Sequence, residues 1–215
     1  CSVYIIAMCL LLIFKEVGMP RKTFFNLPID KKQRIIDAAY DLFIENDYKD
    51  VNIRKITRKA GISIGSFYQY FYDKDDLYLY LIAEIEKKVY DEYKKKAGKF
   101  LTDEIVIPVE EICTPKEIEF TNTWDNAPTE VKVKFYFGEY AKEMNRIVWD
   151  ELVELKESGR LVEGVDLEFV FHLYVTCMFN ILMYFKEKNI TDEKERFYFK
   201  RKFYMEWFVN RLIKK

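Results

Sequence analysis

The stretch that most constrains this chain runs from Asn52 to Phe71 and reads NIRKITRKAGISIGSFYQYF. Apolar residues recur within it at i, i+3 and i+7 in two short segments, about 53–60 and 64–70, with Gly61 between them. This spacing buries one side of a helix and leaves the other side free. We therefore expect two short helices around a tight turn, with Ser63 as the N-cap of the second helix.

The free side of this helix pair is predicted to be basic. Between Asn52 and Lys74 one acid, Asp73, stands against five basic residues: Arg54, Lys55, Arg58, Lys59 and Lys74. The local balance of five minus one is +4, whereas the whole chain has a formal charge of -1. A basic face on a near-neutral protein indicates an anionic partner, although solvated helix surfaces are also often basic. Together with the helix-turn-helix pattern, it favours DNA.

Composition predicts an all-α fold and argues against catalysis. The chain has 215 residues, half of them apolar, with few glycines and prolines and no sustained β alternation. Its four cysteines are scattered and its one histidine, His172, stands alone. No nucleophile–base pair, metal-ligand spacing or phosphate-cradling loop is visible. We therefore expect no catalytic residues, no metal and no cofactor, and reduced thiols in the cytoplasm.

The N-terminal region, 1–28, is expected to be an extension. Val3–Phe14 is an apolar run of twelve residues, short of the roughly 20 that a membrane span needs. No basic residue precedes it, as a signal peptide would require. Our hypothesis is that 1–18 lie upstream of the functional protein; the alternative is a membrane-associating or partner-binding segment. Arg21–Pro28 is predicted to be an extended basic arm.

A helix starting at Asp30, with Gln33 as capping-box partner, is expected to reach about Asn46. Residues 31–82 contain the segments IDAAYDLFIENDY, VNIRKIT, KAGISIGSFYQYF and DKDDLYLYLI. Through these segments the chain resembles the tetracycline-repressor (TetR) family of bacterial regulators. Two departures, Asn52 where the family has Thr and Thr57 where it has Ala, are compatible with the same structure.

The resemblance implies a three-helix DNA-binding domain over 29–73 and a helical ligand-binding and dimerisation domain over 74–215. The residues expected at operator DNA are Asn52, Arg54, Ser63, Gly65, Ser66, Tyr68, Gln69, Tyr70 and Lys74. Ser66 and Gln69 are predicted to read base edges, and Arg54 and Lys74 to contact phosphates. Gly65 costs about 1 kcal/mol inside a helix, which indicates that its lack of a side chain matters. We expect the reason to be close approach to DNA, and the alternative is tight packing against the first helix of the pair.

Helices are expected through the rest of the chain. Asp73 and Asp76 bracket the start of a helix to about Lys96, which in the family links the two domains. Further helices are predicted over about 101–113, 115–126, 128–158, 166–188 and 191–215, with N-caps at Thr114, Asp166 and Thr191.

The predicted 166–188 helix is apolar on every side except for His172, Thr176 and Asn180. A helix apolar all round is buried all round, which indicates a partner subunit. The expected dimer residues are Phe169, Val170, Leu173, Phe203, Trp207 and Phe208. The expected pocket residues are Trp124, Phe137, Tyr140, Met144, His172 and Thr176. The three polar residues could hydrogen-bond across a dimer interface, line a ligand pocket or make hydrogen bonds within the core of their own chain.

These observations predict a homodimeric transcriptional regulator, a repressor released by a small-molecule effector of unknown identity. Its partners would be double-stranded operator DNA, a second copy and that effector, with no membrane. The alternatives are a regulator of the same type controlled by a protein partner, and a helical enzyme.

Overall fold

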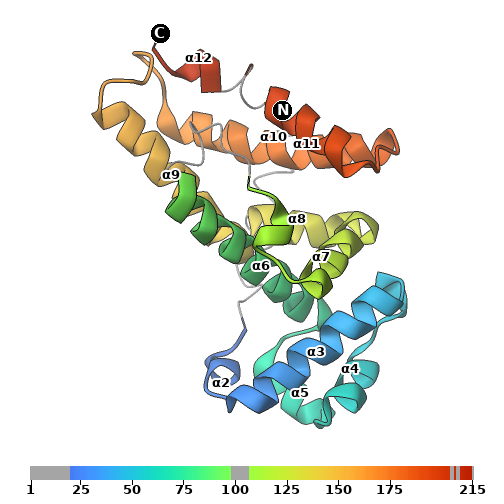
Figure 1. The fold of residues 1–215 in the computed structure, drawn as a ribbon. Helices are drawn as coiled ribbons and strands as arrows, with labels where there is room; N and C mark the ends of the chain where they lie inside the picture. The colour runs from blue at the N-terminus through green and yellow to red at the C-terminus, as the bar shows by residue number, and fades with distance from the viewer. Residues whose placement is uncertain (1–19, 98–106, 204–205, 207–208, 215) are drawn as a thin grey trace, which may run out of the picture. The chain divides into compact units, whose positions relative to one another are not determined.

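The computed structural model describes residues 20–97, 107–203, 206 and 209–214 (Figure 1). Helices make up its regular structure, and in these described ranges no strand forms beyond an isolated bridge between Leu161 and Ile213. The predicted all-α fold is therefore confirmed. The hypothesis about 1–18 falls outside the described residues.

The chain divides into two compact units. The first takes in the described residues through Asp91 together with Ile107–Lys142, and the second takes in the described parts of Glu92–Val106 and Glu143–Lys215. This division places the segment 107–142 with the helix-turn-helix, whereas the sequence suggested a functional boundary near residue 74. The functional boundary stays a prediction, because compactness alone does not test it.

The first unit contains the predicted three-helix domain. Its helices are α3 (Ile29–Glu45), α4 (Ile53–Ala60) and α5 (Ile64–Tyr70), with a short α2 (Lys22–Phe25) ahead of them and most of the long α6 (Lys74–Ala97) after them. A 3-10 turn, η1 (Tyr48–Asp50), joins α3 to α4. The apolar side chains that hold these helices together are almost fully buried: Ile35, Ala39, Phe43, Ile56, Phe67 and Phe71.

Two predicted caps of this domain are confirmed, and one is wrong. Ser63 accepts from the Ser66 backbone N–H at the start of α5, and α6 begins with the expected pair. There Asp73 accepts from the Asp76 N–H at 2.8 Å, and Asp76 accepts from the Tyr72 N–H at 2.9 Å.

The capping box expected at Asp30 does not form. The N-cap of α3 is Pro28, so Asp30 lies inside the first turn and accepts from Arg34 at 3.1 Å instead. Gln33 donates to Asp37 rather than turning back to the cap. The proline ahead of Ile29 has an extended ψ of 142° that starts the helix earlier than the capping pattern suggested.

The rest of the first unit consists of short pieces. They are η2 (Val109–Glu111), α7 (Pro115–Asn122), η3 (Thr123–Asn126), α8 (Thr129–Phe137) and η4 (Glu139–Ala141). The capping box of Thr114 and Glu117 is confirmed.

Two predicted helices of this region are corrected. Of the helix expected over 101–113, residues 101–106 lie outside the described part, and the remainder holds only the η2 turn after Pro108. The helix expected over 128–158 is broken, because Gly138 is extended (φ -108°, ψ -166°) and interrupts the helical hydrogen-bond ladder. A Cβ on Gly138 would lie 2.2 Å from the Lys134 carbonyl oxygen, so only glycine fits this break.

The second unit contains most of α9 (Lys142–Glu157), then α10 (Leu167–Glu187), α11 (Glu193–Lys202) and α12 (Asn210–Leu212). The Asp166 cap of α10 is confirmed by its bond from the Phe169 N–H at 3.1 Å. The Thr191 cap is wrong, because Asp192 caps α11 and accepts from the Glu195 N–H. Of the helix expected over 191–215, the structure describes α11 to Lys202 and α12 over Asn210–Leu212, and residues 204–205 and 207–208 between them lie outside the described part.

Within one chain, α10 is buried on one side only. Its buried residues include Val170, Tyr174, Ile181 and Phe185, whereas Phe169 is 51% exposed. The expectation of burial all round therefore does not hold within the single chain. By length and composition alone, α10 is also apolar enough to cross a membrane. This is weak evidence for a membrane-spanning helix, because core helices of soluble proteins pass the same test.

Candidate nucleic-acid interface

The α4–α5 pair presents a polar face over a closed apolar core. Asn52 caps α4 and accepts from the Lys55 N–H at 3.0 Å, and Gly61 ends the helix in the left-handed region with φ 66°. The predicted DNA-binding residues that are exposed are Asn52, Arg54, Ser63, Gly65, Tyr68 and Gln69, and Ser66 is half-buried. Seven of the nine predicted residues thus share an accessible surface of this pair.

Gly65 lies in open space within the chain. A Cβ built on it would meet only the Ser63 hydroxyl oxygen, at an ordinary 3.8 Å. Tight packing against α4 therefore does not explain the glycine. Its neighbours Ser63 and Ser66 are linked to each other by a hydroxyl–hydroxyl bond of 2.9 Å, which holds the start of α5 in one conformation.

Two predicted DNA-binding residues have side chains that are buried or hydrogen-bonded within the first unit. Tyr70 is 5% exposed, and its ring packs against Phe24 in the core. The Lys74 ammonium donates to the carbonyls of Tyr48 at 2.7 Å and Val51 at 2.9 Å, and lies 4.5 Å from the Tyr48 ring centroid. Burial lowers the pKa of Lys74 from its usual value. Both residues hold the start of α6 and the end of α5 in place.

Two of the four basic residues of α4 also have partners within the protein, although both side chains stay accessible. Lys59 pairs with Asp41 at 3.0 Å and with Glu45 at 3.6 Å, while Lys55 donates to the Asp50 carbonyl. Arg54 and Arg58 stay exposed. Sequence spacing places all four on one side of the helix, but only side-chain geometry shows which of these cations already have a partner in the same chain.

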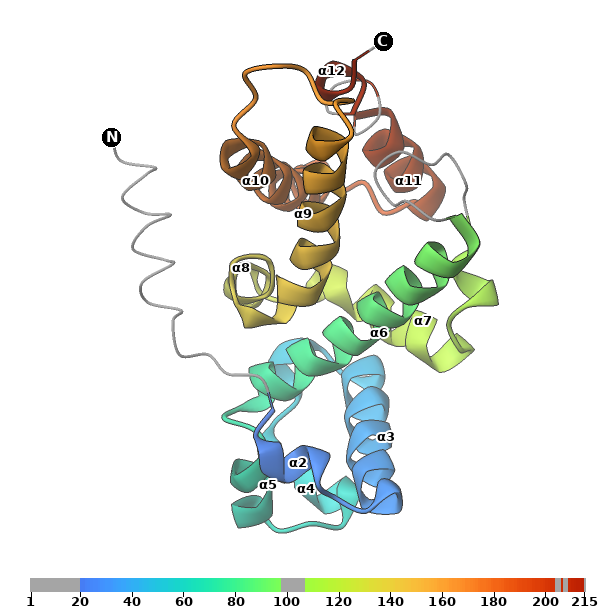
Figure 2. The same cartoon turned by 90° about the vertical axis from the view of Figure 1, so that its left-hand side faces the viewer.

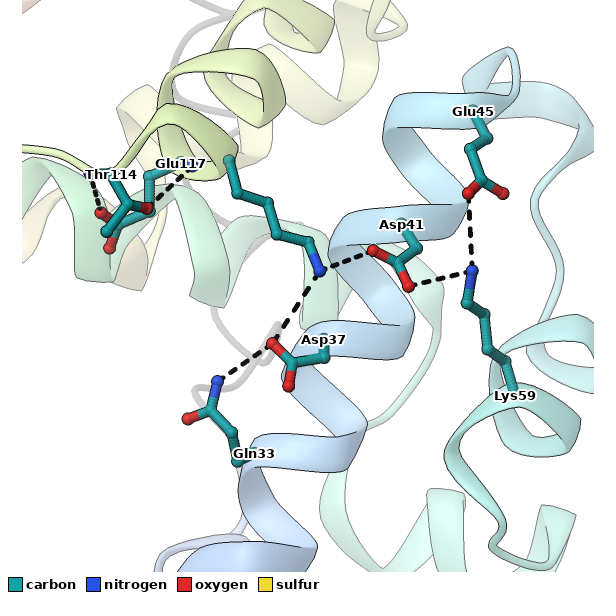
Figure 3. A network of polar contacts seen from close by, with 8 residues as sticks. Gln33, Asp37, Asp41, Glu45, Lys59, Thr114 and Glu117 are labelled. Carbon is teal, nitrogen blue, oxygen red and sulfur yellow. Dashed lines mark hydrogen bonds and ion pairs between the residues drawn. The ribbon is translucent and has the colours of Figure 1, made fainter.

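A polar network ties α3 to α7 (Figure 3). Lys116 of α7 reaches Asp41 at 2.5 Å, and Asp41 also receives Lys59 from α4. The hydrogen bond from Lys116, with that from Lys59, lowers the pKa of the Asp41 carboxyl despite partial burial. Glu117, beside Lys116, completes the Thr114 capping box and pairs with Lys88 of α6 at 2.8 Å. Sequence reasoning missed this network because its members lie far apart in the chain.

A second contact between the helix-turn-helix domain and the later part of the first unit lies at the first turn of α6, where α8 and η4 meet it. Asp75 accepts from the Tyr48 hydroxyl at 2.6 Å and pairs with Lys134 at 2.7 Å. Asp76 is 0% exposed and accepts from the Tyr140 hydroxyl, which also donates to the Asp76 carbonyl at 2.9 Å. These contacts anchor the first turn of α6 to η1 beside the helix-turn-helix and to α8 and η4.

The residues predicted to line a ligand pocket are found in different surroundings. Tyr140 is buried at Asp76, and Trp124 stacks on Tyr78 with ring centroids 6.1 Å apart. Phe137 is half-buried. In the second unit His172 is exposed, and Thr176 donates to its carbonyl at 2.8 Å, so the Thr176 hydroxyl is satisfied locally. The Met144 side chain lies outside the described part, and the pocket stays a prediction.

The predicted dimer residues are described in part. Phe169 is 51% and Leu173 39% exposed on α10, while Val170 is buried within its own unit and Phe203 is half-buried. Trp207 and Phe208 lie outside the described residues. Phe169 and Leu173 belong to one exposed face of α10, which also carries His172, Asn180 and Tyr184.

The described residues offer no group of three or more His, Cys, Asp or Glu side chains arranged to hold a metal ion. The two described cysteines, Cys113 and Cys177, are free thiols, and burial raises the pKa of each.

A buried three-helix core, a capped pair with an exposed polar face, and a long helix leaving it define a helix-turn-helix DNA-binding protein. The comparisons make the class specific. A family profile described as "Bacterial regulatory proteins, tetR family" matches residues 35–81. The fatty acid metabolism regulator protein of Bacillus subtilis (strain 168) is 32% identical over 155 residues, covering 64% of this chain and 74% of that protein. The chain belongs to the tetR family, as the sequence predicted.

Other similarities are shorter or weaker. The HTH-type transcriptional regulator HbdR of Aromatoleum sp. (strain CIB) is 38% identical over 84 residues, which are 39% of this chain and 34% of HbdR. The match therefore spans about a third of that relative. Among solved structures, the fatty acid degradation regulator FadR from Bacillus halodurans has a TM-score of 0.49 at 19% identity, covering 85% of this chain and 98% of that one. These relatives are transcriptional regulators, not enzymes.

Proposed function

We propose that this protein is a homodimeric, sequence-specific DNA-binding regulator that represses its target and is released by a small-molecule effector. The observation that carries the proposal is the exposed face of α4 and α5, with Arg54, Gly65 and Gln69 on a rigidly capped pair. In a dimer, the two copies of α5 would enter major grooves about one helical turn apart or a multiple of it.

Within this face the proposed roles differ. Gln69 and Ser66 read base edges, while Gly65 lets the backbone approach the groove closely. Arg54 and Tyr68 contact phosphates, which position the protein without specifying sequence. Asn52 and Ser63 cap their helices and offer polar groups next to the backbone. Lys74 and Tyr70 position the helices, because Lys74 is hydrogen-bonded to the Tyr48 and Val51 carbonyls and Tyr70 is buried.

The dimer is proposed to form on the exposed face of α10. Phe169, Leu173 and Tyr184 are apolar groups left accessible on a helix whose opposite face is buried. Covering such a face removes apolar surface from water, worth about 25 cal/mol per Å². The polar His172 and Asn180 on the same face fit hydrogen bonding across the interface.

The effector signal is proposed to reach DNA through α6. Tyr140 and Lys134 hold its first turn from η4 and α8, and Asp75 connects that turn to Tyr48 beside the helix-turn-helix. A ligand that favours a different arrangement of η4 and α8 would shift α6, and it needs only to bind the non-DNA state more tightly. Such a regulator works in the cytoplasm, where its operator is, and needs no membrane partner.

One relative is named a fatty acid metabolism regulator, which nominates acyl-chain compounds as the first effectors to screen. The experiment is a mobility shift with a duplex selected by the protein, titrated with acyl compounds. Binding that a compound abolishes supports the ligand-released repressor. Binding that only a captured protein abolishes supports control by a protein partner, and no DNA binding at all contradicts the proposal.

A further inference from the structure

The segment ahead of α3 is not the extended arm that the sequence suggested. Its residues Lys22–Phe25 form a helical turn, α2, that packs against the recognition helix α5 (Figure 2). Phe24 is 0% exposed, with its ring centroid 4.7 Å from Phe71 and 5.4 Å from Tyr80. The segment is therefore anchored by a core residue and belongs to the DNA-binding domain.

Two polar bonds fix α2 at the C-terminal end of α5. The Arg21 N–H donates to the Tyr70 carbonyl at 2.9 Å, and the Thr23 hydroxyl donates to the Gln69 carbonyl. Both carbonyls belong to the last turn of α5, which has no helical partner for them. The backbone of the segment is thus held next to Gln69.

The side chains of this segment are cationic and accessible. Arg21 and Lys22 are exposed, and the Arg21 guanidinium lies 4.5 Å over the ring of Tyr72. From Pro20 to Arg34 there are five basic residues against one acid, a balance of +4 that lies outside the 52–74 patch. Of these five, Arg21 and Lys22 lie on the segment that is bonded to the C-terminal end of α5, so they add two accessible cations there.

We propose that Arg21 and Lys22 are part of the DNA-binding surface and contact backbone phosphates next to the bases that α5 reads. The inference rests on the proposed function and deepens it. Because Phe24 and the two bonds hold the segment in place, little ordering entropy is lost on binding, unlike with a flexible arm. Phosphate contacts add affinity equally on every sequence, and each releases counterions.

The test is the salt dependence of binding for the full-length dimer and the R21Q/K22Q variant. Glutamine keeps most of each aliphatic stem, so an unchanged melting temperature is expected. The slope of log K against log[salt] should become shallower by about 2, one for each cation. Affinity should fall by a similar factor on a selected duplex and on a scrambled duplex of equal length.

The control is K156A/R160A, which removes the same two charges from exposed positions in the second unit. It should leave the slope near that of the wild type. If R21Q/K22Q matches this control in slope and affinity while the wild type binds its selected duplex, this inference is wrong and the proposed function stands. If the wild type binds no duplex, the proposed function fails and this inference with it.

Discussion

The hydroxyl of Tyr140 in η4 donates to both the carboxylate and the main-chain carbonyl of Asp76 in the first turn of α6, the carbonyl at 2.9 Å. Residues 64 positions apart are thereby joined at a fully buried carboxyl group. Since Asp76 also caps α6 through the Tyr72 N–H, this one contact links the capping of the long helix to the segment after the Gly138 break.

Tyr140→Phe should destabilise the protein, because the buried Asp76 carboxyl loses a donor and gains no replacement. The expected loss is about 1–3 kcal/mol in the free energy of unfolding, measured by urea titration. Tyr198→Phe is the matched control, since the Tyr198 side chain is 68% exposed. Equal unfolding midpoints for the two variants would show that the Tyr140 bonds contribute nothing.

Asp76 should make stability depend on pH. Burial, with a smaller contribution from Asp73, raises its pKa to about 7, although the Tyr72 N–H, Arg21 and Lys134 favour the charged form. The folded state therefore binds the Asp76 proton more tightly than the unfolded state, whose pKa is about 3.9. The stabilisation is complete below about pH 4, is lost as the pH rises to about 7, and changes no further above that.

The measurement is urea unfolding of wild type and Asp76→Asn at several pH values from 5 to 8. The wild type should lose more stability than the variant over this range, by up to about 1.4 kcal/mol per unit of pKa difference. Parallel curves for the two proteins would contradict a raised pKa for Asp76.

Gly65→Ala tests whether that glycine allows close approach to DNA. No contact closer than 3.8 Å opposes the new methyl group, and alanine is favoured over glycine inside a helix by about 1 kcal/mol. The variant should therefore melt at a higher temperature. Its operator affinity should fall by about tenfold or more, since a clash costing about 1.4 kcal/mol is already tenfold. Unchanged affinity in a fluorescence titration would remove Gly65 from the interface.

Lys74→Met tests whether Lys74 positions helices or contacts DNA. Methionine cannot donate to the Tyr48 and Val51 carbonyls, so a loss of about 1.5–3 kcal/mol of stability is expected. The salt slope of DNA binding should stay as in the wild type. Lys49→Met, which changes a lysine with a 77% exposed side chain, is the control. A slope shallower by about one with an unchanged melting temperature would instead assign Lys74 to a phosphate.

Local patterns predicted the helix-turn-helix well. The Ser63 cap, the turn at Gly61 and the buried apolar side of each helix, which includes Ile56 and Phe67, all follow from residue types at fixed short spacings. These features need only neighbours in sequence, so a single chain carries enough information for them.

Long-range features were not predictable in the same way. The engagement of Lys74 and Lys59 depends on carbonyls and carboxylates brought close only by packing. Tyr140, which contacts Asp76, lies in the η4 turn directly after the Gly138 break, whereas the sequence predicted one continuous helix over 128–158. The α2 segment was missed because Phe24, its anchor, has meaning only against the α5–α6 core.

The central claim is that α5 reads DNA sequence as part of a dimer, and selection of duplexes from a random pool tests it most directly. The wild type should enrich a two-fold symmetric site with half-sites about one helical turn apart or a multiple of it. Gln69→Ala should enrich a site altered at the same position of both halves, with unchanged folding. Enrichment of no sequence by the wild type, or of the identical site by the variant, would contradict this account.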